Sequence, residues 1–75
     1  MTFVVYSAEW CPSCNVLKNR MKSEGIEFVE KNVDTDLDAA DILMENNLRS
    51  IPQVFTSEGI YAGDAKTFEA NHLSP

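Results

Sequence analysis

The chain begins with a continuous apolar run and then changes to a helical pattern. Residues 3–6, Phe-Val-Val-Tyr, are aromatic and β-branched without a polar interruption, which predicts a strand buried on both faces. The apolar positions that follow at helical spacing are Cys14, Leu17 and Met21, with Val16 beside them. We expect this helix to begin at Pro12, whose fixed φ suits a first helical position, and to end at Gly25.

The rest of the chain continues the alternation of strand and helix. The expected elements are a strand over residues 27–33, a helix reaching Leu48, strands over residues 53–56 and 60–61, and a helix from Asp64 through Phe68. Thr35 or Asp36 is expected to cap the middle helix. The apolar stripe of that helix is expected to be Leu37, Ala40, Met44 and Leu48. Right-handed crossovers make the first strand pair parallel, and the closing hairpin is antiparallel, so the pattern predicts an α/β fold.

The composition indicates one small soluble domain. The chain has 75 residues and 44% hydrophobic content, so it is near the lower size limit of a domain that buries an adequate core. We expect a single domain over residues 1–75. A net charge of −6 argues against nucleic acid and anionic membranes as partners. Neither a signal peptide nor an apolar run of membrane-spanning length is found, so we expect a cytoplasmic protein, and a monomer.

The most informative motif is Cys11-Pro12-Ser13-Cys14, between the first strand and the first helix. Two thiols at this spacing interconvert between a dithiol and a disulfide, and a sulfur at a helix N-terminus is favoured as the thiolate that attacks disulfides. We expect Cys11, ahead of the first helical turn, to be exposed, and Cys14, on the apolar stripe, to be buried and protonated. The alternative is a zinc site, but the chain has only two cysteines, and nothing in the spacing gathers His72 and a carboxylate as further ligands.

Basic residues are concentrated directly after the dithiol. Lys18, Arg20 and Lys22 fall on the first helix, and they are half of the six basic residues in the chain. They form either a solvated helix face or a surface that attracts an acidic partner toward the dithiol. Glu9, two residues before Cys11, opposes their positive charge.

Three segments of the sequence together resemble the glutaredoxin family, over the whole length of the chain. They are residues 6–14 with the dithiol, Ser50-Ile51-Pro52-Gln53-Val54-Phe55, and Tyr61-Ala62-Gly63-Asp64. The resemblance implies a thioredoxin fold of the minimal glutaredoxin type, a four-stranded mixed sheet in the order β-α-β-α-β-β-α with flanking helices. It also implies a thiol–disulfide oxidoreductase that reduces protein or glutathione mixed disulfides, with Cys11 as the attacking thiol and Cys14 as the resolving one.

The same resemblance implies a binding site for glutathione as the reductant, and no metal. The residues expected in that site are Trp10, Ser13, Ile51, Pro52, Gln53, Gly63 and Asp64. Taken alone, Pro52 is a turn proline before a strand, but in glutaredoxins the matching proline is cis. We therefore expect a cis bond facing Cys11, which leaves the backbone N–H and C=O of Ile51 free to pair with an extended peptide.

Several positions depart from the glutaredoxin pattern. Ala8 stands where the family usually carries a Lys or Arg that meets a glutathione carboxylate, and Arg49 is either a solvated loop charge or its replacement. Ser13 replaces the usual Tyr, and Trp10 before the first cysteine is a thioredoxin feature. Residues 61–63 are similar to the Trp-Ser-Gly of the glutaredoxin-like electron donors of ribonucleotide reductase. The electron source is therefore glutathione or thioredoxin reductase, and the clients are disulfide-containing proteins, with ribonucleotide reductase among the candidates.

Two other classes of function are weighed against reduction. Some glutaredoxins carry an iron–sulfur cluster between two subunits, but Pro12 after the first cysteine disfavours this in the family. A binding module that uses the fold without turnover is the other alternative, and the intact dithiol of Cys11 and Cys14 argues against it.

Overall fold

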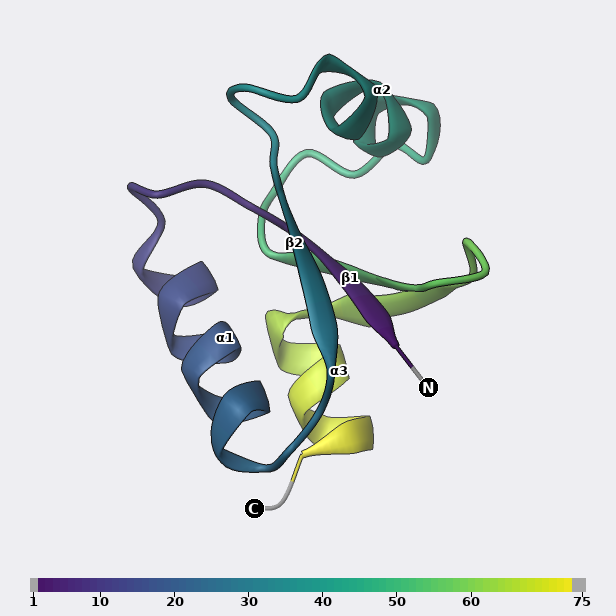
Figure 1. The fold of residues 1–75 in the computed structure, drawn as a ribbon. Helices are drawn as coiled ribbons and strands as arrows, with labels where there is room; N and C mark the ends of the chain where they lie inside the picture. The colour runs from purple at the N-terminus through teal and green to yellow at the C-terminus, as the bar shows by residue number, and fades with distance from the viewer. Residues whose placement is uncertain (1, 74–75) are drawn as a thin grey trace.

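The computed structural model describes residues 2–73 and has one four-stranded sheet with helices on both faces (Figure 1). The elements are β1 (Phe3–Ser7), α1 (Pro12–Ser23), β2 (Phe28–Asn32), α2 (Leu37–Glu45), β3 (Gln53–Thr56), β4 (Tyr61–Asp64) and α3 (Ala65–His72). This confirms the predicted order, and the strands lie in the order β2-β1-β3-β4. Within residues 2–73, no helix is long and apolar enough to cross a membrane.

The strand pairing determines which loops meet. β1 pairs with β2 in parallel, with Ser7 opposite Asn32. β1 pairs with β3 antiparallel, with Tyr6 opposite Gln53, and β3 pairs with β4 antiparallel. The C-terminal end of β1 and the N-terminal end of β3 therefore lie side by side at the same end of the sheet. The loop after β1, which carries the dithiol, consequently meets the loop before β3, which carries Pro52.

Successive side chains of β1 point to opposite faces of the sheet, and each face has its own core. On one face Val5 packs beneath α1 and α3, and on the other Tyr6 packs beneath α2 (Figure 1). The first core consists of Phe3, Val5, Leu17, Met21, Val54, Phe68 and Leu73. The second consists of Tyr6, Ala39, Leu43 and Phe55. The prediction of a first strand buried on both faces is therefore confirmed.

α1 follows the predicted pattern with one exception. Pro12 takes the first helical position, and Gly25, with a φ of 72°, follows the helix end. The buried residues of the helix are Cys14, Leu17 and Met21, as predicted. Val16 is 54% exposed, and its placement beside the buried stripe is wrong. Each residue is rotated by about 100° from the next, which turns Val16 away from the sheet.

The predicted buried face of α2 is wrong for Leu37 and Met44, whereas Leu48 is partly buried against the second core. The residues that it buries are Ala39 and Leu43, whereas Leu37 and Met44 are 80% and 74% exposed. α2 has apolar residues on several sides, so the spacing alone is compatible with more than one buried face. Contact with the aromatic side chains of β1 and β3 selects the face that packs. Met44 is thereby left at the surface of the molecule.

The remaining elements differ from the predictions mainly in their bounds. β3 has the predicted bounds, and β2 is shorter than the predicted residues 27–33. β4 extends beyond the predicted residues 60–61, and α3 continues past Phe68 to His72. Asp64 is the N-cap of α3, as predicted.

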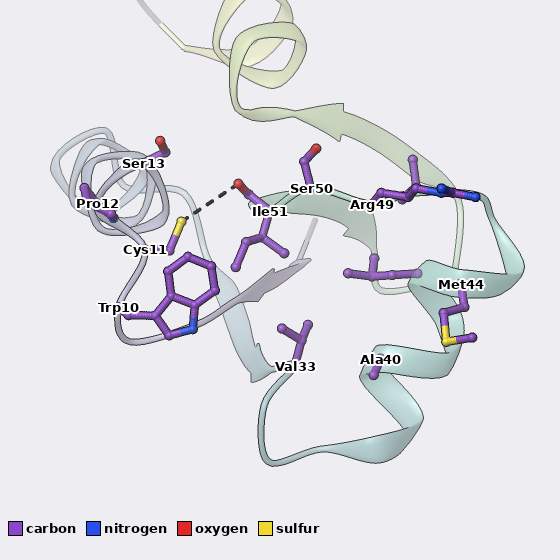
Figure 2. Close-up of a pocket in the computed structure, with 12 residues that line it drawn as sticks. Trp10, Cys11, Pro12, Ser13, Val33, Ala40, Met44, Arg49, Ser50 and Ile51 are labelled. Atoms are coloured by element: carbon purple, nitrogen blue, oxygen red, sulfur yellow. Dashed lines mark hydrogen bonds between the residues drawn. The ribbon is translucent and has the colours of Figure 1, made fainter.

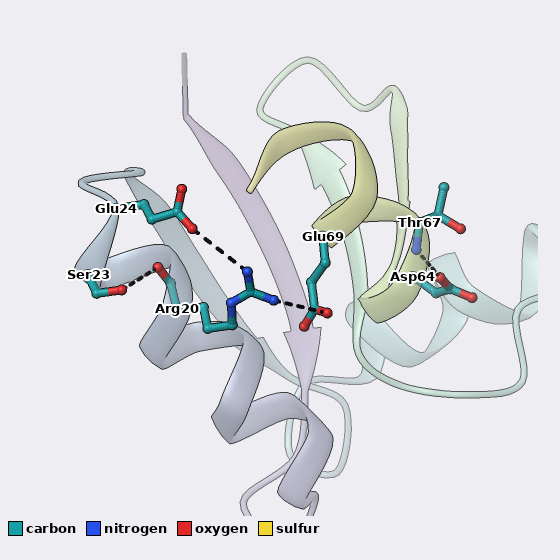
Figure 3. A network of polar contacts seen from close by, with 6 residues as sticks. All are labelled: Arg20, Ser23, Glu24, Asp64, Thr67 and Glu69. Carbon is teal, nitrogen blue, oxygen red and sulfur yellow. Dashed lines mark hydrogen bonds and ion pairs between the residues drawn. The ribbon is translucent and has the colours of Figure 1, made fainter. Parts of the chain in front are cut away.

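Two of the basic residues of α1 form ion pairs with acidic side chains. Arg20 lies 3.2 Å from Glu69 of α3 and 4.0 Å from Glu24 (Figure 3). Lys18 lies 2.9 Å from Glu30. At 1.5 Å per residue, Arg20 is about 13 Å along the helix from the first cysteine. These ion pairs and this distance argue against a surface that attracts an acidic partner to the dithiol.

Candidate dithiol active site

Cys11 occupies the N-cap position of α1, where the extended chain turns into the helix. Its Sγ accepts a hydrogen bond from the backbone N–H of Cys14 at 3.2 Å. The backbone of Cys11 closes the turn, because its N–H donates to the Ala8 carbonyl and its own carbonyl accepts from the Asn15 N–H, both at 3.2 Å. The sulfur is thus held against the N–H groups of a helix N-terminus, where negative charge is stabilised.

The expected exposure of Cys11 is wrong, because only 4% of the residue is exposed. Cys11 clusters with Ala8 and Cys14, and Val33 and Ile51 pack against this cluster. Ile51 comes from a loop 40 residues away in sequence, so no local pattern predicts this cover. The sulfur nevertheless borders the larger of two cavities described below, and a reactant reaches it from that side (Figure 2).

Cys14 is fully buried beneath the first turn of α1, as predicted. Burial, the main cause, and the interaction with the Cys11 side chain together raise the pKa of Cys14 to about 12. Cys14 is therefore a protonated thiol at neutral pH. Both cysteines are free in this structure. The two sulfurs occupy different environments, which is the arrangement that a sequential attack requires.

The loop before β3 faces the dithiol. The Ile51–Pro52 peptide bond is cis, as predicted, and Pro52 is buried. The thiol of Cys11 lies 3.8 Å from the Ile51 carbonyl oxygen and donates to it (Figure 2). The carbonyl that was expected to be free is therefore in contact with Cys11. When Cys11 ionises it loses this S–H donor, and the carbonyl becomes available to the N–H of a bound peptide.

The side chain of Gln53 is held inside the protein. Gln53 is 3% exposed, and its Nε2 donates to the Ser50 carbonyl at 3.0 Å and to Ser50 Oγ at 3.2 Å. Its Oε1 accepts from the Tyr61 hydroxyl at 2.6 Å. These bonds connect β4 to the loop that carries Pro52. The structure therefore shows the Gln53 side chain in a positioning role, and its expected contact with glutathione stays a prediction.

Gly63 and Asp64 lie at the end of β4, directly before α3. Gly63 has a φ of 117°, and a Cβ there would lie 3.0 Å from Thr67 Cβ and 3.1 Å from the Phe68 backbone nitrogen. Asp64 accepts the backbone N–H of Thr67 at 2.9 Å (Figure 3), which is the main cause that lowers the pKa of its carboxyl. Asp64 borders a smaller cavity of about 200 Å³, with Ser13, Ser50, Ile51, Pro52, Ala65 and Lys66. Gly63 lies behind this cavity and does not line it.

Trp10 is 68% exposed. Its indole N–H donates to Asp34 Oδ2 at 2.8 Å, which holds the ring beside the dithiol. Between Trp10 and α2 lies the larger cavity, of about 550 Å³, which we call the α2 groove (Figure 2). Its apolar lining includes Trp10, Val33, Leu43, Met44, Leu48 and Ile51. The sequence interpretation missed this groove because it placed Met44 in the core.

The structure also places the remaining candidate residues. Ala8 is fully buried and presents no side chain to either cavity, whereas Arg49 lines the α2 groove. Lys66, which the sequence interpretation did not single out, supplies a cation to the smaller cavity. His72 is exposed and stacks on the buried Phe68, with ring centroids 4.6 Å apart. Among residues 2–73, no group of three or more His, Cys, Asp or Glu is placed to hold a metal ion.

Known structures share this fold. The glutaredoxin-like protein NrdH-redoxin from Escherichia coli, described as having a thioredoxin-like activity profile, is 26% identical over the full length of both chains, with a TM-score of 0.77. Wheat glutaredoxin is 26% identical over 91% of this chain and 68% of its own, with a TM-score of 0.74. Buckwheat glutaredoxin in complex with glutathione is 24% identical over 93% of this chain and 66% of its own, with a TM-score of 0.77. No curated protein sequence matches the chain.

Family-level similarity agrees with the geometry of the dithiol. The sequence model of the glutaredoxin family matches residues 3–60, which include the dithiol and the Pro52 loop. Since that match covers more than half of the chain and the fold is the one found in glutaredoxin structures, the chain belongs to the glutaredoxin family.

Proposed function

We propose that the protein is a dithiol oxidoreductase that reduces disulfides in client proteins and mixed disulfides with glutathione. One observation carries this proposal: Cys11 Sγ is held 3.2 Å from the N–H of Cys14, while the Cys14 thiol is buried beside it. One sulfur is thus placed to ionise and attack, and the other is kept protonated until it is needed. Membership of the glutaredoxin family supports the same reaction.

The reaction proceeds in two exchange steps. The Cys11 thiolate attacks one sulfur of the client disulfide, forms a Cys11–client mixed disulfide and releases the other client sulfur as a thiolate. The Cys14 thiol then gives its proton to that thiolate, and the Cys14 thiolate attacks Cys11 Sγ. The bond between Cys11 and the client breaks, the second client sulfur leaves as a thiolate that takes a proton from water, and the protein holds a Cys11–Cys14 disulfide. The client has gained two electrons, which the protein must recover from a reductant.

Glutathione fits the site only in part. The smaller cavity offers the Ile51 backbone, the ring of Pro52 and the ammonium of Lys66, which suits a ligand carboxylate. Its volume is about 200 Å³, and the charged Asp64 carboxylate borders it and repels an anionic ligand. The Gln53 amide is already bonded within the protein, and Ala8 is buried. We therefore expect glutathione to act as a reductant with modest efficiency.

Thioredoxin reductase is the other candidate for reducing the Cys11–Cys14 disulfide, and specific observations favour it. The exposed Trp10 and the apolar α2 groove offer a protein partner more surface than the smaller cavity offers glutathione. NrdH-redoxin, with its thioredoxin-like activity profile, matches this chain over its full length. Residues 61–63 resemble the electron donors of ribonucleotide reductase, so we propose that enzyme as one client. We further propose a monomer that works in the reducing cytoplasm, where a dithiol is maintained.

A comparison of reductants tests the proposal. The same small disulfide is offered with glutathione and glutathione reductase, and separately with NADPH and thioredoxin reductase. We expect turnover in both assays, and faster turnover with thioredoxin reductase. Cys11→Ser is the control and should abolish both activities. If the protein shows no turnover with glutathione and none with thioredoxin reductase, the proposed function is overturned. If turnover is faster with glutathione than with thioredoxin reductase, glutathione is the preferred reductant.

A further inference from the structure

The α2 groove combines exposed apolar side chains with a nucleophilic sulfur at one end. Trp10 forms one lip and is 68% exposed, and Met44 of α2 forms the other and is 74% exposed. Figure 2 shows Val33 and Ile51 between these lips and Cys11 at the end nearest Trp10. A volume of about 550 Å³ accommodates a large side chain together with the backbone that carries it. An apolar group bound there would bring a neighbouring cysteine of its own chain to Cys11.

The side of the molecule around this groove is strongly acidic. The acidic residues of the segment 34–45 are Asp34, Asp36, Asp38, Asp41 and Glu45, and the segment contains no basic residue. Lys31 lies 4.0 Å from Asp36, and Arg49 lines the groove itself. The basic residues of α1, in contrast, lie with that helix on the other face of the sheet (Figure 1). A segment that approaches the groove along α2 therefore meets negative charge.

The stability of α2 explains Asp36, which is its N-cap, and Asp38, which lies in its first turn, but it does not explain Asp41 and Glu45. Asp38 and Asp41 are three residues apart and Asp41 and Glu45 are four apart, so like charges are neighbours on the helix surface, which is unfavourable. Glu45 lies in the last turn, where a negative charge opposes the helix dipole, and this turn contains no basic residue. Since Asp41 and Glu45 weaken the helix that carries them, a role in binding accounts for these two residues better than a role in folding.

We propose that the α2 groove binds a basic segment of the client protein, in which Lys or Arg flank an apolar side chain close to the client's disulfide. The inference rests on the proposed function and specifies the class of substrate. The apolar side chain enters between Trp10 and Met44, and the flanking cations face Asp41 and Glu45. The client sulfur then meets Cys11, and the exchange steps described above follow unchanged.

Three synthetic peptides test this preference. Each carries one Phe and one Cys joined by a disulfide to 2-mercaptoethanol, and they differ only in two flanking residues, which are Lys, Gln or Glu. The rate constant for reduction by the wild-type protein is measured from Trp10 fluorescence, since this is the single tryptophan. We expect the Lys peptide to react about tenfold faster than the Glu peptide at low ionic strength, because complementary charge accelerates encounter. The ratio should fall at about 1 M salt, where the Debye length is about 3 Å.

Charge reversal with a matched control locates the effect. The double variant Asp41→Lys, Glu45→Lys should invert the ratio of the Lys-peptide to the Glu-peptide rate. Glu27→Lys, Glu58→Lys changes the net charge equally, at the end of the sheet away from the dithiol. Glu27 lies there because its carbonyl bonds the N–H of Phe3, and Glu58 because it follows Thr56, which is opposite Phe3. This control variant should retain the wild-type ratio.

The outcomes separate the inference from the proposed function. If the wild type reduces none of the three peptides, both are overturned. If it reduces all three at equal rates at low salt, or if both double variants change the ratio equally, the oxidoreductase function remains and the basic-client inference is overturned. If the α2 variant alters the KM for thioredoxin reductase and leaves the peptide ratio unchanged, the groove binds the reductase, which also overturns the inference.

Discussion

Replacing Gly63 with alanine should strongly destabilise the protein, because the added methyl group meets α3. The new Cβ would lie 3.0 Å from Thr67 Cβ and 3.1 Å from the backbone nitrogen of Phe68. Since one of these atoms is backbone, relief requires α3 to shift, and such overpacking costs about 1–3 kcal/mol. The φ of 117° adds about 1–3 kcal/mol for a residue with a Cβ. The combined loss of about 2–6 kcal/mol is a large part of the about 4–11 kcal/mol expected for a domain of this size.

Gly59 supplies the matched control. It also has a positive φ, of 90°, but a Cβ there would meet no atom within 4 Å. Gly59→Ala therefore measures backbone strain alone, and the difference between the two variants measures the contact with α3. Urea unfolding should show Gly63→Ala to be less stable than Gly59→Ala by about 1–3 kcal/mol, with similar m values. Equal losses of unfolding free energy in the two variants would refute the role of Gly63 in packing against α3. A role in binding a ligand would then better explain the glycine at this position.

Two further predictions concern the sulfur environment and the Pro52 loop. Cys14 retains its proton in the folded protein above the pH at which the unfolded chain loses it, because burial raises its pKa from 9.0 to about 12. The free energy of unfolding should therefore fall between pH 9 and 12, by at most about 1.4 kcal/mol per pH unit, and a fall that persists undiminished in Cys14→Ala would contradict this cause. Tyr61→Phe removes the donor to Gln53 Oε1, so we expect a loss of about 0.5–1.5 kcal/mol and slower disulfide reduction as the loop loosens. An unchanged urea midpoint and rate in Tyr61→Phe would show that this bond does not hold the loop.

The sequence predicted the features that depend on neighbouring residues. The cap by Asp64, the buried stripe containing Cys14 and the bounds of β3 follow from local spacing and capping chemistry, and the structure confirms them. The resemblance to glutaredoxins added the cis bond before Pro52, which no local pattern indicates.

The errors arise where residues distant in sequence decide the outcome. Cys11 is buried because Ile51 reaches it from a separate loop, and periodicity carries no information about that contact. Met44 faces solvent because the aromatic residues of β1 and β3 select the opposite side of α2. The hydrogen bond from Tyr61 of β4 to the Gln53 amide also joins distant residues, and the sequence did not predict it. Each error concerns tertiary packing, and because Met44 was placed in the core, the α2 groove was not predicted.

The most direct test of the account is to identify which sulfur is attacked first. Cys14→Ser and Cys11→Ser are each treated with a peptide disulfide, and the trapped mixed disulfide is measured by intact-protein mass spectrometry. We predict rapid formation of one adduct on Cys11 in the Cys14→Ser variant. In the Cys11→Ser variant we predict little adduct, because Cys14 is fully buried and protonated. Faster adduct formation on Cys14 than on Cys11 would contradict the proposed order of attack and resolution.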